Sequence, residues 1–237
     1  MKYMGSKARH ANAILSVIKE RFPATKVIAE PFCGGANFTY AAKKQGFEVY
    51  PSDTHADVIS YLQALSNGWI PPKSITEAEY RNLRFAECSP LRGYAGFALS
   101  YGGKWFGGWR RDSLEKRDYG RESWNAAMKE QGVLKGMNFK CQSYEALTQF
   151  GDVVYADPPY SQTTSYLTPF DSAKFWVWAE ACPVPCFVSE YRAANADWKP
   201  VWKKSVANSL AKDTGKTLGV ETLFLHKRWY KELAPIF

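Results

Sequence analysis

A chain of 237 residues is long enough to bury a core of its own, so disulfide or metal staples are not required. Its 31 basic residues outnumber its 23 acidic ones, and the resulting net charge of +8 suits a polyanionic partner. Together with 16% aromatic residues, this charge favours nucleic acid over a membrane surface.

The cysteines and the apolar runs limit the remaining classes. The 5 cysteines include no C-x-x-C pair and the 3 histidines lie far apart, so we expect reduced thiols and no metal site. No apolar run approaches the roughly 20 residues that a membrane span needs. The first residues have no adjoining apolar stretch of signal-peptide length. We therefore expect a cytoplasmic protein without a membrane partner.

The first 68 residues predict alternating helices and strands. Ser6 is expected to cap a helix whose apolar face holds Ala11, Leu15, Ile18 and Phe22. After it come a strand over 27–29, a helix over 37–44, a strand over 47–50 and a helix over 55–65. This order is typical of a parallel sheet covered by helices.

The alternation stops at Trp69 and resumes near Phe139. Between them the sequence shows helical patches without a buried strand, and Thr76 looks like a helix cap followed by early acids. A strand over 139–142, a strand over 153–156, a helix over 172–181, a strand over 186–189 and a terminal hairpin over 201–206 and 221–226 follow. We therefore predict one α/β domain, residues 1–68 and 139–237, with a mainly helical insertion over 69–138.

A glycine turn lies between the first strand and the helix after it. Gly34 and Gly35 allow backbone N–H groups to approach a ligand closely, and Asp53 follows the next strand about 20 residues later. An acid there can bind two ribose hydroxyls. Because a G-x-G-x-x-G pattern and a Walker lysine are missing, a nucleoside without pyrophosphate fits better, and S-adenosylmethionine (SAM) is one. A tight turn with a helix-capping aspartate is the structural alternative.

The segment Asp157-Pro158-Pro159-Tyr160 ends the most buried predicted strand. The prolines fix their own φ angles and hold Asp157 at the carboxyl end of the strand, where α/β sheets bind ligands. A carboxylate and a carbonyl there can accept the two hydrogens of a nucleobase amine and direct its lone pair at a methyl donor. Tyr160 offers a face for stacking on the base. The alternative is a strand-ending turn with a helix-capping aspartate.

With both segments, the chain resembles the Dam-type, alpha-class DNA adenine-N6 methyltransferases, and among them the phage and prophage members. The family's Lys-aromatic-x-Gly-x-Lys pattern matches residues 2–7, its SAM-binding segment resembles residues 30–35, and its D-P-P-Y motif is complete at 157–160. The resemblance implies a Rossmann-like SAM-dependent methyltransferase sheet with a terminal β-hairpin and an inserted target-recognition region. It also implies direct methyl transfer from SAM to a flipped adenine in double-stranded DNA, by a protein expected to be a monomer.

The resemblance implies roles at matching positions. Asp157, Pro158 and Tyr160 would be catalytic: Asp157 would touch SAM and the amine, Pro158 would offer its carbonyl and Tyr160 would stack on the adenine. Tyr3 would pack on the SAM adenine, Lys7 would line the cofactor site, and Asp53 would bind the ribose. Ser143 and Tyr144 fall where the family contacts the cofactor's adenine, although many members have an acid where Ser143 stands. The full expected cofactor set is Tyr3, Lys7, Pro31, Phe32, Gly34, Gly35, Asp53, Ser143, Tyr144 and Asp157.

Residues 101–111 are rich in basic, aromatic and glycine residues and contain no acid. Basic side chains can hold phosphates, arginine can read guanine, and aromatics can fill the space left by a flipped base. A solvated charged face with local aromatic packing is the alternative. The expected DNA-binding residues are Arg92, Lys104, Trp105, Phe106, Trp109, Arg110 and Arg111.

Other activities fit the sequence less well. Cytosine-N4 methylation in the same fold is the nearest alternative, and RNA is a further substrate class that the basic insertion disfavours. A DNA-binding regulator that holds SAM without turnover is opposed by the intact D-P-P-Y motif. A nicotinamide oxidoreductase is opposed by the incomplete glycine pattern and the net charge of +8.

Overall fold

The computed structural model describes residues 1–112, 116–159, 170–206 and 219–230. Within them the centre is a seven-stranded sheet in the order β3-β2-β1-β4-β5-β7-β6. Strands β1 to β5 pair in parallel, whereas β7 lies antiparallel to both β5 and β6. The strands are β1 (Val27–Glu30), β2 (Glu48–Asp53), β3 (Lys140–Cys141), β4 (Val153–Ala156), β5 (Cys186–Glu190), β6 (Trp198–Val206) and β7 (Gly219–His226). The expected α/β fold with its terminal hairpin is confirmed.

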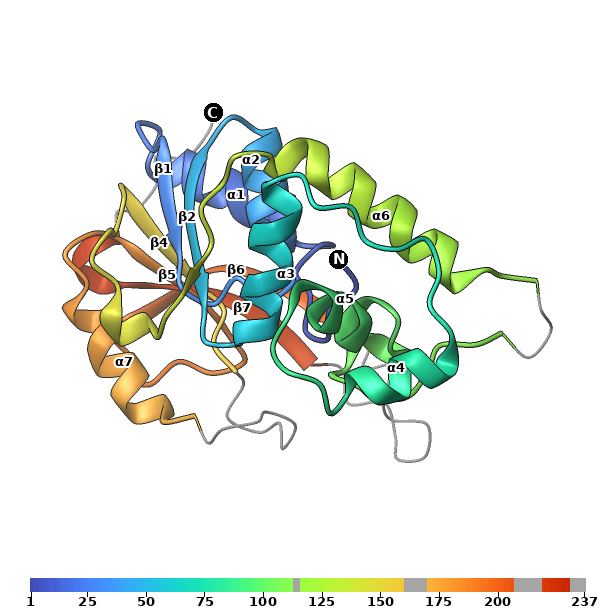
Figure 1. Ribbon diagram of the computed structural model, residues 1–237. Helices are drawn as coiled ribbons and strands as arrows, with labels where there is room; N and C mark the ends of the chain where they lie inside the picture. The colour runs from blue at the N-terminus through green and yellow to red at the C-terminus, as the bar shows by residue number, and fades with distance from the viewer. Residues whose placement is uncertain (113–115, 160–169, 207–218, 231–237) are drawn as a thin grey trace.

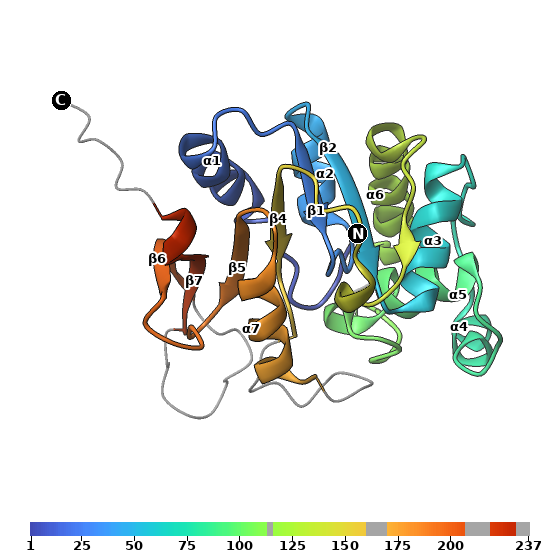
Figure 2. The same cartoon turned by 90° about the vertical axis from the view of Figure 1, so that its left-hand side faces the viewer.

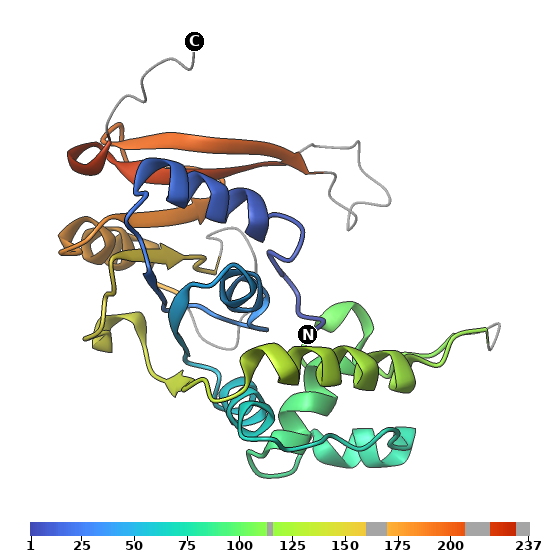
Figure 3. The same cartoon turned by 90° about the horizontal axis from the view of Figure 1, so that it is seen from above.

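Helices cover both faces of the sheet. Helices α1 and α2 lie on one face and α7 on the other, while α3 to α6 gather beyond the β2 side (Figures 1, 2 and 3). No helix in the described ranges has the length and apolar character to cross a membrane. The helices are α1 (Ala11–Arg21), α2 (Asn37–Lys44), α3 (Ala56–Ser66), α4 (Glu77–Leu83), α5 (Pro90–Ala98), α6 (Tyr119–Leu134) and α7 (Ser172–Ala181), with 3-10 turns η1 (Tyr101–Gly103), η2 (Tyr144–Ala146) and η3 (Lys227–Trp229).

The core lies on both sides of the central strands. Val153 and Tyr155 of β4 belong to the cluster that contains the buried face of α1, whereas Val154 and Ala156 belong to the cluster with Phe175 of α7. Successive side chains of a strand point to opposite faces, so a strand buried on both faces must be apolar throughout. This is why the fully buried β4 reads as an unbroken apolar run.

Local signals explain most element ends, with one correction. Helix α2 covers the expected residues, and Gly46 follows it at φ 86°. Thr76 forms a capping box with Glu79 at the start of α4, as expected. The prediction that Ser6 caps α1 is wrong: the helix begins at Ala11, and the Ser6 hydroxyl accepts a hydrogen bond from the Ala8 N–H instead. Ser6 therefore belongs to a turn that leads into the pocket described below.

Residues 69–138 contain α4, α5, η1 and α6. In the described part of this range the only strand-like feature is an isolated bridge between Ser100 and Trp109. Helix α6 packs against α2 and α3, and α5 packs against α3, so this helical region packs on helices that themselves contact the parallel half of the sheet. The division of the chain at residues 68 and 139 into two structural parts stays a prediction.

Candidate active site

A pocket of about 690 Å³ opens at the carboxyl ends of the parallel strands. Glu30 ends β1, Asp53 ends β2 and Asp157 directly follows β4, and all three line the pocket. Because neighbouring parallel strands end at the same sheet edge, the topology brings together acids that are far apart in the sequence. These three carboxyl groups are therefore part of the pocket itself.

Asp53 ties the glycine turn to the end of β2. Its Oδ2 accepts a hydrogen bond of 2.9 Å from the Gly34 N–H, and its Oδ1 accepts one of 2.9 Å from the His55 N–H. Burial raises the pKa of the Asp53 carboxyl, although these N–H groups oppose the shift. Each carboxylate oxygen keeps a second lone pair, so Asp53 can still accept hydrogen bonds from a ligand.

Packing against Tyr3 requires glycine at both positions of the turn. A Cβ on Gly34 would lie 2.8 Å from the Tyr3 ring, and one on Gly35 would lie 2.7 Å from Tyr3 Cβ. Gly34 also has φ 45°, in the left-handed region that glycine favours. Tyr3 therefore lies on the turn, where the sequence alone suggested direct approach by a ligand.

The N-terminal segment joins the glycine turn to the insertion. The Tyr3 ring centroid lies 4.8 Å from that of Phe97 in α5, and the Met4 N–H donates to the Gly103 carbonyl at 2.9 Å. A Cβ on Gly103 would lie 2.8 Å from the Tyr3 backbone nitrogen, so this contact also needs glycine. The N-terminal segment therefore connects the pocket residues that follow β1 with those of η1.

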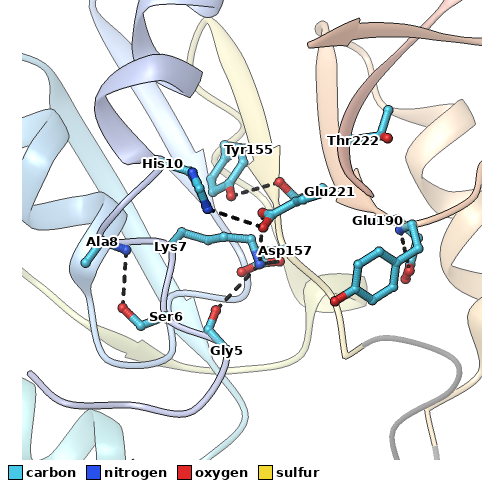
Figure 4. Close-up of polar contacts among 12 residues, drawn as sticks. Gly5, Ser6, Lys7, Ala8, His10, Tyr155, Asp157, Glu190, Glu221 and Thr222 are labelled. Atoms are coloured by element: carbon cyan, nitrogen blue, oxygen red, sulfur yellow. Dashed lines mark hydrogen bonds and ion pairs between the residues drawn. The ribbon is translucent and has the colours of Figure 1, made fainter. Parts of the chain in front are cut away.

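Asp157 forms an ion pair with Lys7. The Lys7 Nζ lies 2.8 Å from Asp157 Oδ1, and the lysine side chain is only 6% exposed (Figure 4). Burial by itself lowers the pKa of Lys7. The carboxylates of Asp157 and Glu221 raise it by more than burial lowers it, so the pKa lies above the usual value. Lys7 is therefore a fixed cation beside the Asp157 carboxylate.

An aromatic wall faces the carboxylates. Phe32 and Tyr144 are stacked with ring centroids 5.4 Å apart, and Phe170 packs edge-on against Phe32 at 5.9 Å. All three line the pocket. A flat apolar surface of this kind suits the face of a purine.

Glu30 and His55 are among the pocket residues that the sequence reasoning did not assign to the site. Glu30 is buried, accepts a hydrogen bond from the Thr39 hydroxyl, and has a pKa raised well above its usual value by burial. Its position before Pro31 at a strand end parallels Asp157 before Pro158, which is the signal that could have found it. His55 lies between Phe97 and Trp105, and its ring nitrogens have no hydrogen-bond partner among the described residues.

Comparison with known families gives a match over part of the chain. Residues 3–87 match the model of a family described as D12 class N6 adenine-specific DNA methyltransferase. The match covers less than half of the chain. The matched range includes the N-terminal segment, the glycine turn and Asp53, and it confirms the expected enzyme class. No individual curated protein matches the chain.

A DNA methyltransferase needs a methyl donor, and the pocket residues fit SAM. The volume of about 690 Å³ lies within the range of small-molecule pockets, roughly 300–1,000 Å³. Asp53 has the position and free lone pairs to accept from ribose hydroxyls, and Phe32 and Tyr144 offer a flat wall. The carboxylates of Glu30 and Asp157 suit a cationic ligand.

The pocket collects most of the expected cofactor and catalytic residues. Pro31 does not line it, and Tyr160 lies outside the described residues. The individual roles of all these residues stay predictions. The expected residues that do line it are Tyr3, Lys7, Phe32, Gly34, Gly35, Asp53, Ser143, Tyr144, Asp157 and Pro158.

The residues expected to bind DNA are distributed between surface and interior. Lys104 and Arg111 are exposed, and Lys104 and Trp105 also line the pocket. Phe106 and Arg110 are buried, Phe106 in the core cluster and Arg110 against the Tyr119 ring. These two have structural contacts here, and their contact with DNA stays a prediction.

Arg92 and Trp109 of the same expected set are held by neighbouring side chains. Arg92 donates to Asp57 at 2.7 Å and lies over the Trp105 ring, and half-buried Trp109 packs beside Tyr80.

Within the described residues no group of three or more side chains suitable for metal binding occurs.

Proposed function

We propose that this protein transfers the methyl group of SAM directly to the N6 amine of an adenine flipped out of duplex DNA. The observation that carries the proposal is Asp157 followed by Pro158 and Pro159 at the carboxyl end of β4, inside the pocket. The family match gives adenine N6 and DNA as the chemistry and substrate. The duplex substrate, the flipping of the base and the roles of individual residues are the parts that we propose beyond the family match.

In this proposal, Asp157 and the Pro158 carbonyl act as two rigid acceptors. The lone pair of an adenine amine is delocalised into the ring, so hydrogen bonds from both N–H groups to fixed acceptors favour a more tetrahedral nitrogen. The N6 lone pair then forms the new N–C bond, and one N6 proton is released to solvent. Lys7 keeps the Asp157 carboxylate ionised and in place.

The cofactor would lie between the ends of β1 and β2 and the aromatic wall. Asp53 would hold its ribose, Phe32 and Tyr144 its adenine, and Glu30 and Asp157 would stabilise its positive charge. Bound SAM supplies the methyl group and leaves as a neutral thioether. The chain contributes orientation and an electrostatic environment without a covalent intermediate.

The finer assignments complete the proposal. The Dam-type arrangement, with the insertion between the SAM-binding segment and the D-P-P-Y motif, would place target recognition in residues 69–138. The net charge of +8 supports contact with the DNA backbone. A phage-like origin, a monomer and a cytoplasmic location are the further parts of this hypothesis.

Methyl transfer from labelled SAM to mixed-sequence duplex DNA tests the proposal. We expect label in DNA and N6-methyladenine after nucleoside analysis, whereas N4-methylcytosine would support the cytosine alternative. Folded protein that binds SAM and DNA without any turnover would contradict the enzymatic assignment and favour a regulator.

Asp157→Ala tests the catalytic assignment within the same assay. We expect a loss of at least about 100-fold in kcat, because an oriented polar contact to the reacting group is removed, with little change in DNA affinity. Asp152→Ala is the matched control. Asp152 lies directly before the first residue of β4, at the end away from the pocket, and accepts hydrogen bonds from the Lys26 and Val27 N–H groups. Its loss should therefore lower stability and leave kcat unchanged.

A further inference from the structure

Glu221 on β7 lies within the charged cluster behind Asp157. The Lys7 Nζ that contacts Asp157 Oδ1 at 2.8 Å also lies 3.4 Å from Glu221 Oε1 (Figure 4). Glu221 is 7% exposed and does not line the pocket. The contact of this buried carboxylate with Lys7 therefore links β7 to Asp157.

The strand pairing holds Glu221 in a fixed position. β7 lies between two antiparallel neighbours, with Glu221 opposite Lys204 of β6 and the adjacent Thr222 opposite Glu190 of β5. The second Glu221 oxygen lies 3.8 Å from His10 Nε2, and the His10 ring packs against Trp202. Backbone pairing and side-chain contacts thus fix the carboxylate from both sides.

Lys7 needs this second carboxylate. A buried ammonium is stable only when counter-charges compensate its lost hydration, and Lys7 has two within 4 Å. Without Glu221, the ammonium would keep its contacts with Asp157 and with the Gly5 carbonyl, 3.5 Å away, and it could move together with Asp157. With Glu221 present, Nζ is held between two anions and its position no longer depends on Asp157 alone.

We propose that Glu221 is a positioning residue for methyl transfer: it fixes Lys7, and Lys7 fixes the Asp157 carboxylate in the orientation that receives the target amine. This inference rests on the proposed function, because it takes Asp157 as the group that orients the amine. A displacement of about 1 Å in such a group costs up to roughly 100-fold in rate.

Glu221→Gln keeps the size of the side chain and removes its charge. We expect kcat for DNA methylation to fall by roughly 10- to 100-fold, while the dissociation constants for SAM and DNA change by at most about twofold. Unchanged kcat in an otherwise active preparation overturns the inference. If wild-type protein itself transfers no methyl group, the proposed function fails instead, so the two failures are distinguishable.

A double-mutant cycle tests the route through Lys7. In a Lys7→Met background, Glu221→Gln should have almost no further effect on kcat, because the group it positions is gone. An equally large effect in both backgrounds overturns the route. Glu221→Asp, which keeps the charge on a shorter side chain, should retain more activity than Glu221→Gln, and equal losses would contradict a role based on charge.

Glu180→Gln is the matched control. Glu180 is half-exposed and lies 3.7 Å from His226 at the other end of β7, and neither residue lines the pocket, so the same chemical change removes a carboxylate outside the site. We expect its kcat to equal that of the wild type. If Glu221→Gln unfolds the protein at assay temperature, both proteins are assayed at a lower temperature at which the variant is folded, and wild-type kcat in the folded variant overturns the inference.

Discussion

Buried charge dominates the chemistry of this pocket at the scale of single residues. Glu30, Asp53 and Asp157 converge there because three neighbouring parallel strands end at one edge. Burial raises the pKa values of Glu30 and Asp53, while Lys7 compensates Asp157. A raised pKa favours the neutral acid, and a cationic ligand such as SAM would favour the ionised form instead.

Glu190, at the end of β5, allows a pH prediction. Burial, with a smaller contribution from the Asp157 charge, raises the pKa of its carboxyl from the usual 4.5 to about 7. Between these pH values the folded state holds a proton that the unfolded state has released. Its contribution to stability is therefore fully present below pH 4.5 and is lost as the pH rises through 7.

Glu190→Gln should remove this dependence, because the amide does not titrate. We expect the variant to gain stability relative to the wild type between pH 5 and pH 8, by at most about 3 kcal/mol. Urea unfolding at both pH values measures it. A stability difference between variant and wild type that stays constant over this range would contradict a raised Glu190 pKa.

At the scale of elements, close helix packing joins the inserted helices to the sheet. Gly93 of α5 lies against α3, where an added Cβ would come within 2.0 Å of the Asp57 carbonyl oxygen. Gly96, one turn further, leaves room for the Trp105 ring, which an added Cβ would approach to 2.2 Å. Two glycines at helical spacing therefore bring α3, α5 and the loop around Trp105 together.

Gly93→Ala tests this packing. The methyl group would meet backbone rather than a flexible side chain, so α3 and α5 must separate, and we expect a loss of about 1–3 kcal/mol in unfolding free energy. Gly132→Ala in α6 is the matched control, since nothing lies within 4 Å of its added Cβ. That change should stabilise the protein by about 0.5–1 kcal/mol through helix propensity. Equal effects of the two substitutions would contradict the packing argument.

At the scale of the whole molecule, some of the basic residues that give the net charge of +8 are engaged in contacts within the protein. Several basic residues of the insertion are held by acids or aromatic rings, as Arg92 is by Asp57 and Arg110 by Tyr119. Exposed Lys104, which also lines the pocket, remains the best placed to meet a DNA phosphate close to the reacting base.

Lys104→Gln should change the salt dependence of DNA binding. Loss of one phosphate contact lowers the slope of log affinity against log salt concentration by about 0.9, uniformly across DNA sequences. Fluorescence anisotropy over a salt series measures this slope. Lys19→Gln, an exposed lysine in the last turn of α1, is the control and should leave it unchanged. The same slope in wild type and Lys104→Gln would place the phosphate contacts elsewhere.

The sequence by itself determined the elements and the motifs. Helix α2 and helix α7 begin and end where the pattern predicted, because side-chain periodicity and the glycine after α2 are local signals. The D-P-P segment after β4 and the acid after the glycine turn were also readable, because prolines, glycines and strand-end acids act within a few residues. These signals were enough to indicate the methyltransferase class that the family match confirms.

Only the tertiary structure decided how the motifs meet. Tyr3 lies on the glycine turn, Glu221 reaches Lys7 from β7, and Phe106 and Arg110 are buried, although all of them looked available or unremarkable in the sequence. Each depends on contacts between residues separated by tens to hundreds of positions, which no local pattern encodes. Burial and the placement of counter-charges arise from the packing of the whole chain, and they fix the electrostatics of the pocket.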